Sequence, residues 1–145
     1  MTIYLDMDGT IADLYGVDGW LEDLRANRTR PYDEAKVMHN MSALAKALNK
    51  AQKNGVQIGI ISWLSKTSTE DYNKAVTKAK IKWLKKHLKS VHFDEIHIVP
   101  YGTPKSTVAA SMGILVDDEE RNRLEWNRGE AYAPEKIFEI LKKIS

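Results

Sequence analysis

Two carboxylates at the end of a short apolar segment are the first residues of the chain that could do chemistry. Asp6 and Asp8 come directly after residues 3–5, and Gly9 and Thr10 follow them. Asp and Gly are common in turns, so each residue alone is typical of a strand that ends in a turn. A buried strand gains nothing from two acids at its tip, and a turn does not account for the combination. The residues at the other strand ends therefore decide how this pair is to be interpreted.

Apolar segments rich in Ile and Val predict four strands, at residues 3–5, 56–61, 95–99 and 114–116. They lack the strict polar alternation of a half-exposed sheet, which indicates burial on both faces. Amphipathic segments predict helices at residues 40–55, 68–88, 104–113, 118–129 and 133–144, with a brief strand at 131–132. Strands that alternate with helices predict a three-layer α/β sandwich with a central parallel sheet, in which ligands bind at the carboxyl ends of the strands.

The other predicted strands also end in polar residues. The second ends at Ser62, the third leads through a turn to Lys105, and the fourth ends at Asp117 and Asp118. We expect all of these side chains at one edge of the sheet, together with Asp6. Carboxylate oxygens are the ligands that Mg²⁺ prefers, while a lysine and a hydroxyl suit phosphoryl oxygens. The sequence therefore predicts a site for Mg²⁺ and a phosphoryl group.

Composition bounds the class of protein. A chain of 145 residues has the length of one domain, so we expect a single domain over residues 1–145. The absence of cysteine excludes thiolate ligands and nucleophiles and favours a cytoplasmic protein. No apolar stretch approaches the roughly 20 residues of a membrane span, and acids interrupt the N-terminal apolar segment where a signal peptide would stand. A net charge of +2 is too small to indicate a nucleic-acid partner by itself.

Two segments carry charge away from the strand ends. Residues 66–89 are rich in lysine and nearly free of acids, and we interpret them as a solvated helix face. Residues 11–40 are long and mixed, and we expect them to form a flap or small lid beside the site. Three arginines in this segment could bind an anionic part of a substrate: Arg25, Arg28 and Arg30.

The sequence DMDGT at residues 6–10 resembles the DxDGT signature of the haloacid dehalogenase (HAD) superfamily. Ser62, Lys105 and the sequence VDDEE at residues 116–120 fall where the second, third and fourth motifs of that superfamily fall, in the same order. The resemblance thus spans nearly the whole chain. It implies a Rossmann-like, HAD-type core with a minimal lid, since neither gap between motifs holds a full cap domain.

The resemblance also implies a role for each matching acid. Asp6 would be the nucleophile that forms an aspartyl-phosphate, and Asp8 would be the general acid and base. Mg²⁺ would be held by Asp6, the backbone carbonyl of Asp8 and Asp117, with Asp118 bound directly or through water. As an alternative, Asp118 could cap the helix that follows it.

The remaining motif residues are expected to contact the phosphoryl group or support those that do. Ser62 and Lys105 would bind the phosphoryl oxygens, and Lys105 would also stabilise the charge of the transition state. Ser65 is a rival for the hydroxyl role, and Thr10 would support the turn. Trp20 and Trp63 are the tryptophans that flank the expected site.

These roles predict a Mg²⁺-dependent phosphomonoester hydrolase with a small phosphorylated substrate. An acid at position 8 favours phosphatase or phosphomutase chemistry over dehalogenation. The sequences DMDGTIAD and VDDEERNRLEW are similar to those of nucleotidase-like members that act on (deoxy)nucleoside monophosphates, whereas a site without a large cap suits phosphorylated polymers such as polynucleotide ends. The alternative of another class is a non-catalytic or receiver-like module that binds phosphate and Mg²⁺; a lysine before the last acid pair disfavours a receiver. The sequence leaves the oligomeric state open.

Overall fold

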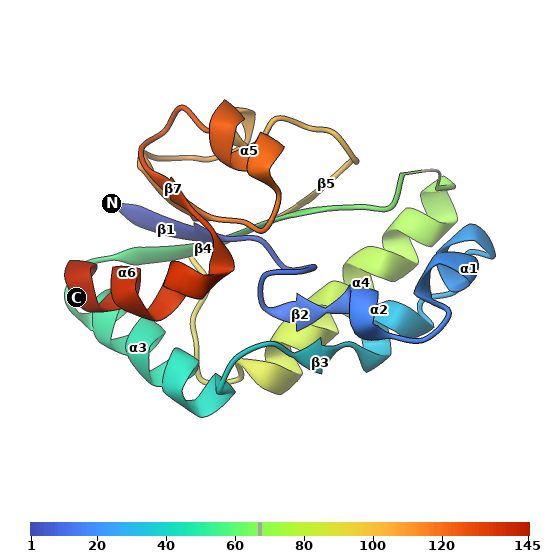
Figure 1. Cartoon of the computed structure of the whole chain (residues 1–145), viewed down its shortest axis with the longest axis horizontal. Helices are drawn as coiled ribbons and strands as arrows, with labels where there is room; N and C mark the ends of the chain where they lie inside the picture. The colour runs from blue at the N-terminus through green and yellow to red at the C-terminus, as the bar shows by residue number, and fades with distance from the viewer. Residues whose placement is uncertain (67) are drawn as a thin grey trace.

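A parallel sheet of five strands forms the central layer of the computed structural model, which describes residues 1–66 and 68–145 (Figure 1). The strands lie in the order β5, β4, β1, β6 and β7, and each neighbouring pair is parallel. Their bounds are β1 Thr2–Leu5, β4 Gln57–Trp63, β5 Glu95–Val99, β6 Gly113–Val116 and β7 Ala131–Tyr132. The α/β fold class and all the predicted strands are confirmed, with small shifts in their bounds.

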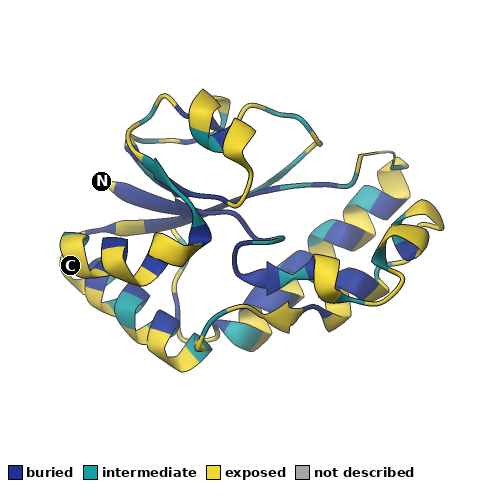
Figure 2. Ribbon diagram, in the orientation of Figure 1, coloured by how far each residue is buried: buried dark blue, intermediate teal, exposed yellow. Residues whose placement is uncertain are grey.

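Helices and connecting segments together cover both faces of this sheet, which explains why its strands lack polar alternation. The main core packs residues such as Ile3, Leu48 and Trp83 between one face and three helices: α3 Met41–Lys53, α4 Glu70–His87 and α6 Ile137–Ile144. Figure 2 shows that buried residues concentrate in the strands and on the inward sides of these helices. None of the helices formed by the described residues has the length and apolar character needed to cross a membrane.

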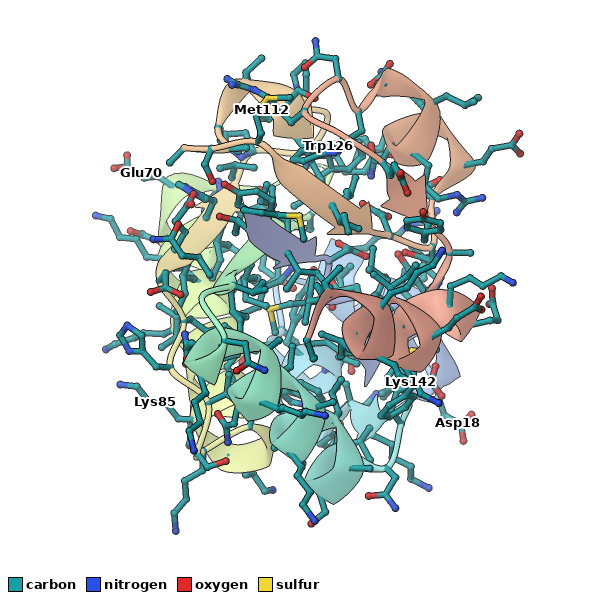
Figure 3. All side chains as sticks on the ribbon, turned by 90° about the vertical axis from the view of Figure 1, so that its left-hand side faces the viewer. Asp18, Glu70, Lys85, Met112, Trp126 and Lys142 are labelled. Atoms are coloured by element: carbon teal, nitrogen blue, oxygen red, sulfur yellow. The ribbon has the colours of Figure 1, made fainter. Side chains whose placement is uncertain are left out.

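The opposite face of the sheet carries a smaller core. Tyr4, Leu115 and Trp126 pack there, next to helix α5 (Glu120–Glu125). Figure 3 shows Trp126 on the other side of the sheet from α6, the helix that carries Lys142. This side is covered mainly by connecting segments rather than by long helices.

The helix predicted at residues 104–113 is wrong apart from its first turn, the 3₁₀ turn Lys105–Thr107. Beyond that turn, side chains of the sheet accept the backbone hydrogen bonds that a helix would have made. The N–H of Ala110 donates to Glu95 Oε1 at 3.1 Å, and that of Ser111 donates to Tyr4 Oη at 3.1 Å. Side-chain acceptors that are distant in sequence thus replace the local bonds.

The helix predicted at residues 118–129 is confined to α5, because later residues of that range find partners elsewhere. The indole Nε1 of Trp126 donates to the carbonyl of Gly113 at 3.1 Å, and the backbone N–H of Asn127 donates to Ser106 Oγ at 2.9 Å. The C-terminal helix is confirmed, although it begins with a 3₁₀ turn at Pro134–Lys136 that leads into α6.

Residues 11–40 form short elements that pack beside the sheet near the carboxyl end of β1. These elements are β2 Ala12–Asp13, η1 Leu14–Gly16, α1 Trp20–Arg25, α2 Arg30–Glu34 and β3 Lys36–Val37, with β2 and β3 antiparallel. The buried carboxylate of Asp23 accepts hydrogen bonds from Arg28 at 3.2 Å and from Arg30 at 2.5 Å. Two of the three arginines that could bind an anionic part of a substrate are therefore paired within the segment itself.

Candidate active site

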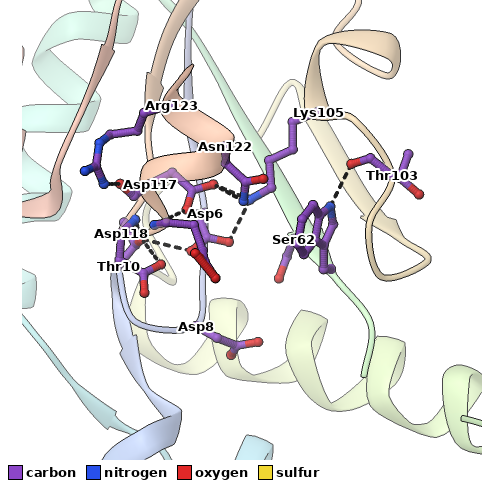
Figure 4. A network of polar contacts seen from close by, with 12 residues as sticks. Asp6, Asp8, Thr10, Ser62, Thr103, Lys105, Asp117, Asp118, Asn122 and Arg123 are labelled. Carbon is purple, nitrogen blue, oxygen red and sulfur yellow. Dashed lines mark hydrogen bonds and ion pairs between the residues drawn. The ribbon is translucent and has the colours of Figure 1, made fainter. Parts of the chain in front are cut away.

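The carboxyl ends of β1 and β6 bring the first and last motifs together. Because the strand register pairs Leu5 with Val116, the next residues, Asp6 and Asp117, lie side by side. Lys105 Nζ donates to Asp6 Oδ1 at 2.9 Å and to Asp117 Oδ2 at 2.6 Å (Figure 4). Burial alone would lower the pKa of the Lys105 ammonium group, but the two carboxylates raise it above its ordinary value. Lys105 is thus a buried cation that bridges two buried acids.

The turn after β1 holds Asp6 in place. Gly9 has a φ of +83°, and a Cβ at this position would lie 2.2 Å from an oxygen of Asp118, so the turn requires glycine. Thr10 Oγ1 donates to Asp6 Oδ2 at 2.9 Å and accepts from the backbone N–H of Asp118 at 3.2 Å. Thr10 therefore ties the nucleophile candidate to the segment after β6, a more direct part than the turn support expected of it.

Three carboxylates among the described residues, those of Asp6, Asp117 and Asp118, offer oxygens within 4.8 Å of one another and could hold a metal ion. Burial, followed by the charge of Asp6, raises the pKa of Asp117 to about 6. Loss of hydration, again followed by the charge of Asp6, raises the pKa of Asp118 to about 8. The cluster thus carries more negative charge than Lys105 alone balances, and a divalent cation would relieve the repulsion. Helix α5 starts after Glu119, so Asp118 does not cap it.

The carboxyl group of Asp8 lies apart from the cluster and contacts a different lysine. Lys80 Nζ, from the middle of α4, donates to Asp8 Oδ2 at 2.8 Å, to Ser62 Oγ at 2.7 Å and to the carbonyl of Trp63 at 2.7 Å. Burial raises the pKa of Asp8, and the charge of Lys80 opposes that effect. With 1% of its surface exposed, Lys80 contradicts the solvated face expected for this segment.

The two serines proposed for phosphoryl binding differ in their surroundings. Ser62 is fully buried, is hydrogen-bonded to Lys80, and does not line the cavity described below. Ser65 lines that cavity, and its buried hydroxyl has no hydrogen-bond partner among the described residues. Ser62 lies within β4 and Ser65 lies two residues beyond its end, and of the two it is Ser65 that lines the cavity.

A cavity of about 540 Å³ opens beside the acids. The charged residues of the strand ends line it: Asp6, Asp8, Lys105, Asp117 and Asp118. Leucines and aromatic residues also line it, and the aromatic ones are Tyr15, Trp20, Tyr32, Trp63 and Tyr101. The rings of Tyr15 and Trp20 pack edge to face with centroids 5.0 Å apart, and Trp63 Nε1 donates to the carbonyl of Thr103 at 2.8 Å. The cavity is therefore lined both by the charged residues of the strand ends and by aromatic rings.

Comparison with known proteins extends the fold assignment. No family model and no curated protein sequence matches the chain. Among solved structures, the D,D-heptose 1,7-bisphosphate phosphatase of B. bronchiseptica, complexed with magnesium and phosphate, matches with a TM-score of 0.54 and 16% identity. The match covers 90% of this chain and 78% of that one. The two chains share a fold.

Sequence reasoning missed Lys80, although a signal for it was present, and it also missed Asn122, whose Nδ2 donates to Asp117 Oδ2 at 3.1 Å. Lysines at positions 78, 82 and 85 are exposed, and Figure 3 shows Lys85 extending from the helix into solvent. Lys80 instead lies four residues after Val76 and three before Trp83, on the apolar stripe of the helix that packs against the sheet. A lysine on a core-facing stripe needs a buried partner, and this placement alone could have separated it from its neighbours.

Proposed function

We propose that this protein is a phosphatase of the HAD superfamily, a Mg²⁺-dependent phosphomonoester hydrolase that works through an aspartyl-phosphate on Asp6. The observation that carries the proposal is the convergence of Asp6, Lys105 and Asp117 at one sheet edge, with Asp118 in the same cluster and Asp8 lining the same cavity. The similarity in fold to a phosphatase whose structure holds magnesium and phosphate supports it.

The reaction has two steps in this proposal. A carboxylate oxygen of Asp6 attacks phosphorus while the bond from phosphorus to the leaving oxygen breaks, and the carboxyl group of Asp8 gives its proton to that oxygen. Water then attacks phosphorus, Asp8 takes a proton from it, and the bond between phosphorus and Asp6 breaks. The products are an alcohol and phosphate, and both acids return to their starting states. The raised pKa of Asp8 supports its part as a proton donor.

The residues present fit a bound Mg²⁺. The carboxylates of Asp6, Asp117 and Asp118 would hold it with the backbone carbonyl of Asp8, and the repulsion within this cluster supports such a cation. When bound, Mg²⁺ supplies charge neutralisation between the nucleophile and the phosphoryl group. Lys105 stabilises the charge that develops on the phosphoryl oxygens, and Ser65, the serine that lines the cavity, donates a hydroxyl hydrogen to them.

The stabilisation of the fold by Mg²⁺ is expected to grow as the pH rises from about 6 to about 8. In the unfolded chain both acids ionise near pH 4, so the metal-free fold binds extra protons between pH 4 and the raised pKa values of Asp117 and Asp118. These extra protons stabilise the metal-free fold relative to the unfolded chain, and this stabilisation is lost as the pH rises from about 4 through the raised pKa values. Mg²⁺ competes with the same protons, so the increase in unfolding temperature on adding Mg²⁺ should be small at pH 6 and larger at pH 8.

The measurement is thermal unfolding with Mg²⁺ or chelator across this pH range, with sodium chloride at matched ionic strength as the control for screening. An increase in unfolding temperature that is independent of pH would contradict the expectation.

For the substrate, we propose a (deoxy)nucleoside monophosphate. A base is planar, and stacking on aromatic side chains contributes about 1–3 kcal/mol per base. The cavity next to the acids offers such side chains, and the 11–40 segment, acting as a minimal lid, supplies Tyr15 and Trp20. Release of phosphate from nucleoside monophosphates, sugar phosphates and a 3′-phosphorylated oligonucleotide, with Mg²⁺ and with chelator, tests both activity and substrate. Preference for the oligonucleotide would favour a phosphatase of polynucleotide ends, and no release from any of them would contradict the proposed function.

Replacement of Trp20 by Ala is expected to raise KM for a nucleoside monophosphate about tenfold, which corresponds to the loss of one stacking contact. Its effect on a substrate without a ring, such as glycerol phosphate, should be small, because the phosphoryl contacts stay in place. Trp20→Phe, which keeps a planar ring, should retain most of the affinity. Steady-state kinetics on both substrates give the comparison, and an equal rise of KM for both would show that the ring does not contact the base.

A further inference from the structure

Lys80 is a buried cation that makes all of its hydrogen bonds within the protein. Its ammonium group has three hydrogens and three acceptors, at 2.7–2.8 Å: Asp8 Oδ2, Ser62 Oγ and the carbonyl of Trp63. The side chain is 1% exposed and does not line the cavity. Its Nζ also lies 5.2 Å from the centre of the Tyr32 ring, which comes from the 11–40 segment. Lys80 therefore has neither a free hydrogen nor an open path for contact with a substrate.

Stability alone is a weak explanation for this arrangement. A buried ion pair commonly contributes no more to stability than apolar side chains of similar size, because both charges lose their hydration. The three acceptors of Lys80 instead indicate a part in the proposed reaction. One is the proposed proton donor, and the other two belong to the end of β4, where the hydroxyl of the second motif stands.

We propose that Lys80 is a positioning residue for Asp8: its ammonium group, anchored on Ser62 and Trp63, holds the carboxyl group of Asp8 by a hydrogen bond where that group exchanges a proton with the leaving oxygen. The inference rests on the proposed function. In the first step the proton moves from Asp8 to the leaving oxygen as the bond from that oxygen to phosphorus breaks. Lys80 keeps its three hydrogens throughout, and its charge faces the carboxylate that Asp8 becomes.

This role predicts that the fall in kcat/KM on replacing Lys80 depends on the leaving group of the substrate. An alkoxide requires a proton as it leaves, whereas p-nitrophenolate leaves without one, and a positioned general acid contributes about 10²–10⁴-fold where it is needed. For Lys80→Met we expect kcat/KM to fall about 100-fold with a nucleoside monophosphate, and by less than about fivefold with p-nitrophenyl phosphate. Use of kcat/KM restricts the comparison to steps up to transfer of the phosphoryl group. Lys82→Met, an exposed lysine on the same helix, should change neither value.

A double variant tests whether Lys80 acts through Asp8. If it does, Asp8→Asn with Lys80→Met should have the same kcat/KM as Asp8→Asn alone, because the second substitution removes nothing further. The double variant also leaves no unpaired carboxylate beside position 80, so it keeps the comparison available if Lys80→Met does not fold. Circular dichroism and thermal unfolding of each variant establish that the compared proteins are folded.

The outcomes separate the inference from the function on which it rests. Equal losses with both leaving groups, or losses that add in the double variant, would overturn the role of Lys80 while the unchanged protein remains an active phosphatase. Absence of Mg²⁺-dependent release by the unchanged protein would overturn the proposed function, and the role of Lys80 with it. The inference is supported if Lys80→Met lowers kcat/KM selectively with the alkyl leaving group and if Lys80→Met causes no further fall when Asp8→Asn is already present.

Discussion

Asp6→Asn is expected to lower kcat for Mg²⁺-dependent phosphate release by at least about four orders of magnitude, because the proposed nucleophile is lost. The carboxamide has nearly the shape of the carboxylate, and its oxygen can still accept the hydrogen bond from Thr10. It cannot form the bond to phosphorus that a carboxylate forms. Acid quenching followed by mass spectrometry should detect a phosphorylated Asp6 peptide in the unchanged protein and none in the variant.

The same substitution should not unfold the protein. Asp6 contributes to the raised pKa values of Asp117 and Asp118, so removal of its charge relieves repulsion within the cluster. The unfolding temperature in chelator should therefore stay the same or rise. Asp71→Asn, which changes an exposed acid at the start of α4, serves as the matched control and should keep full activity. Substantial turnover by Asp6→Asn would exclude Asp6 as the nucleophile.

Lys105→Met is expected to lower kcat about 10³-fold and also to destabilise the metal-free protein. Removal of one positioned donor from a site that stabilises developing charge typically costs 10²–10³-fold, and this donor is a full positive charge. Loss of the ammonium group leaves the buried carboxylates of Asp6 and Asp117 without their shared partner. Breaking a buried ion pair in this way costs about 3–5 kcal/mol of the free energy of unfolding.

Mg²⁺ distinguishes the two effects of this substitution. A divalent cation replaces part of the missing positive charge, so Mg²⁺ should recover more stability in Lys105→Met than in the unchanged protein, while activity stays low. Urea unfolding with Mg²⁺ and with chelator, together with phosphate release, measures both quantities. Lys89→Met, at an exposed position, is the control. A variant as stable as the unchanged protein in chelator would contradict the bridging part assigned to Lys105.

Much of this arrangement was predictable because the patterns that carry it are local in sequence. The apolar segments predict the strands, and the polar residues that follow them predict the edge of the sheet at which Asp6, Lys105 and Asp117 meet. Side chains at the carboxyl ends of parallel strands need no further information to be brought together. The turn after Asp8 was also predictable from its glycine, although the positive φ and the close approach of Asp118 that require glycine there are visible only in the structure.

The residues that were not predicted depend on contacts between distant parts of the chain. The pattern of residues 104–113 is helical, but Glu95 and Tyr4 supply acceptors that replace a helix, and neither is visible from that stretch. Likewise, a lysine-rich segment is usually solvated. The apolar stripe of the helix could have marked Lys80 as buried, but its partners, Asp8 and Ser62, are distant in sequence and cannot be read from that stretch. The pairing of Arg28 and Arg30 with Asp23 is of the same kind.

The pairing of β1 with β6 has a consequence for how the molecule assembles. Asp6 and Asp117 come from opposite ends of the chain and become neighbours only when these two strands are joined in register. A folding intermediate that lacks β6 contains no acid cluster, however complete its other helices and strands are. A cation held by these carboxylates therefore binds only species in which β1 and β6 are paired. Its binding free energy opposes any partial unfolding that separates these two strands as fully as it opposes global unfolding.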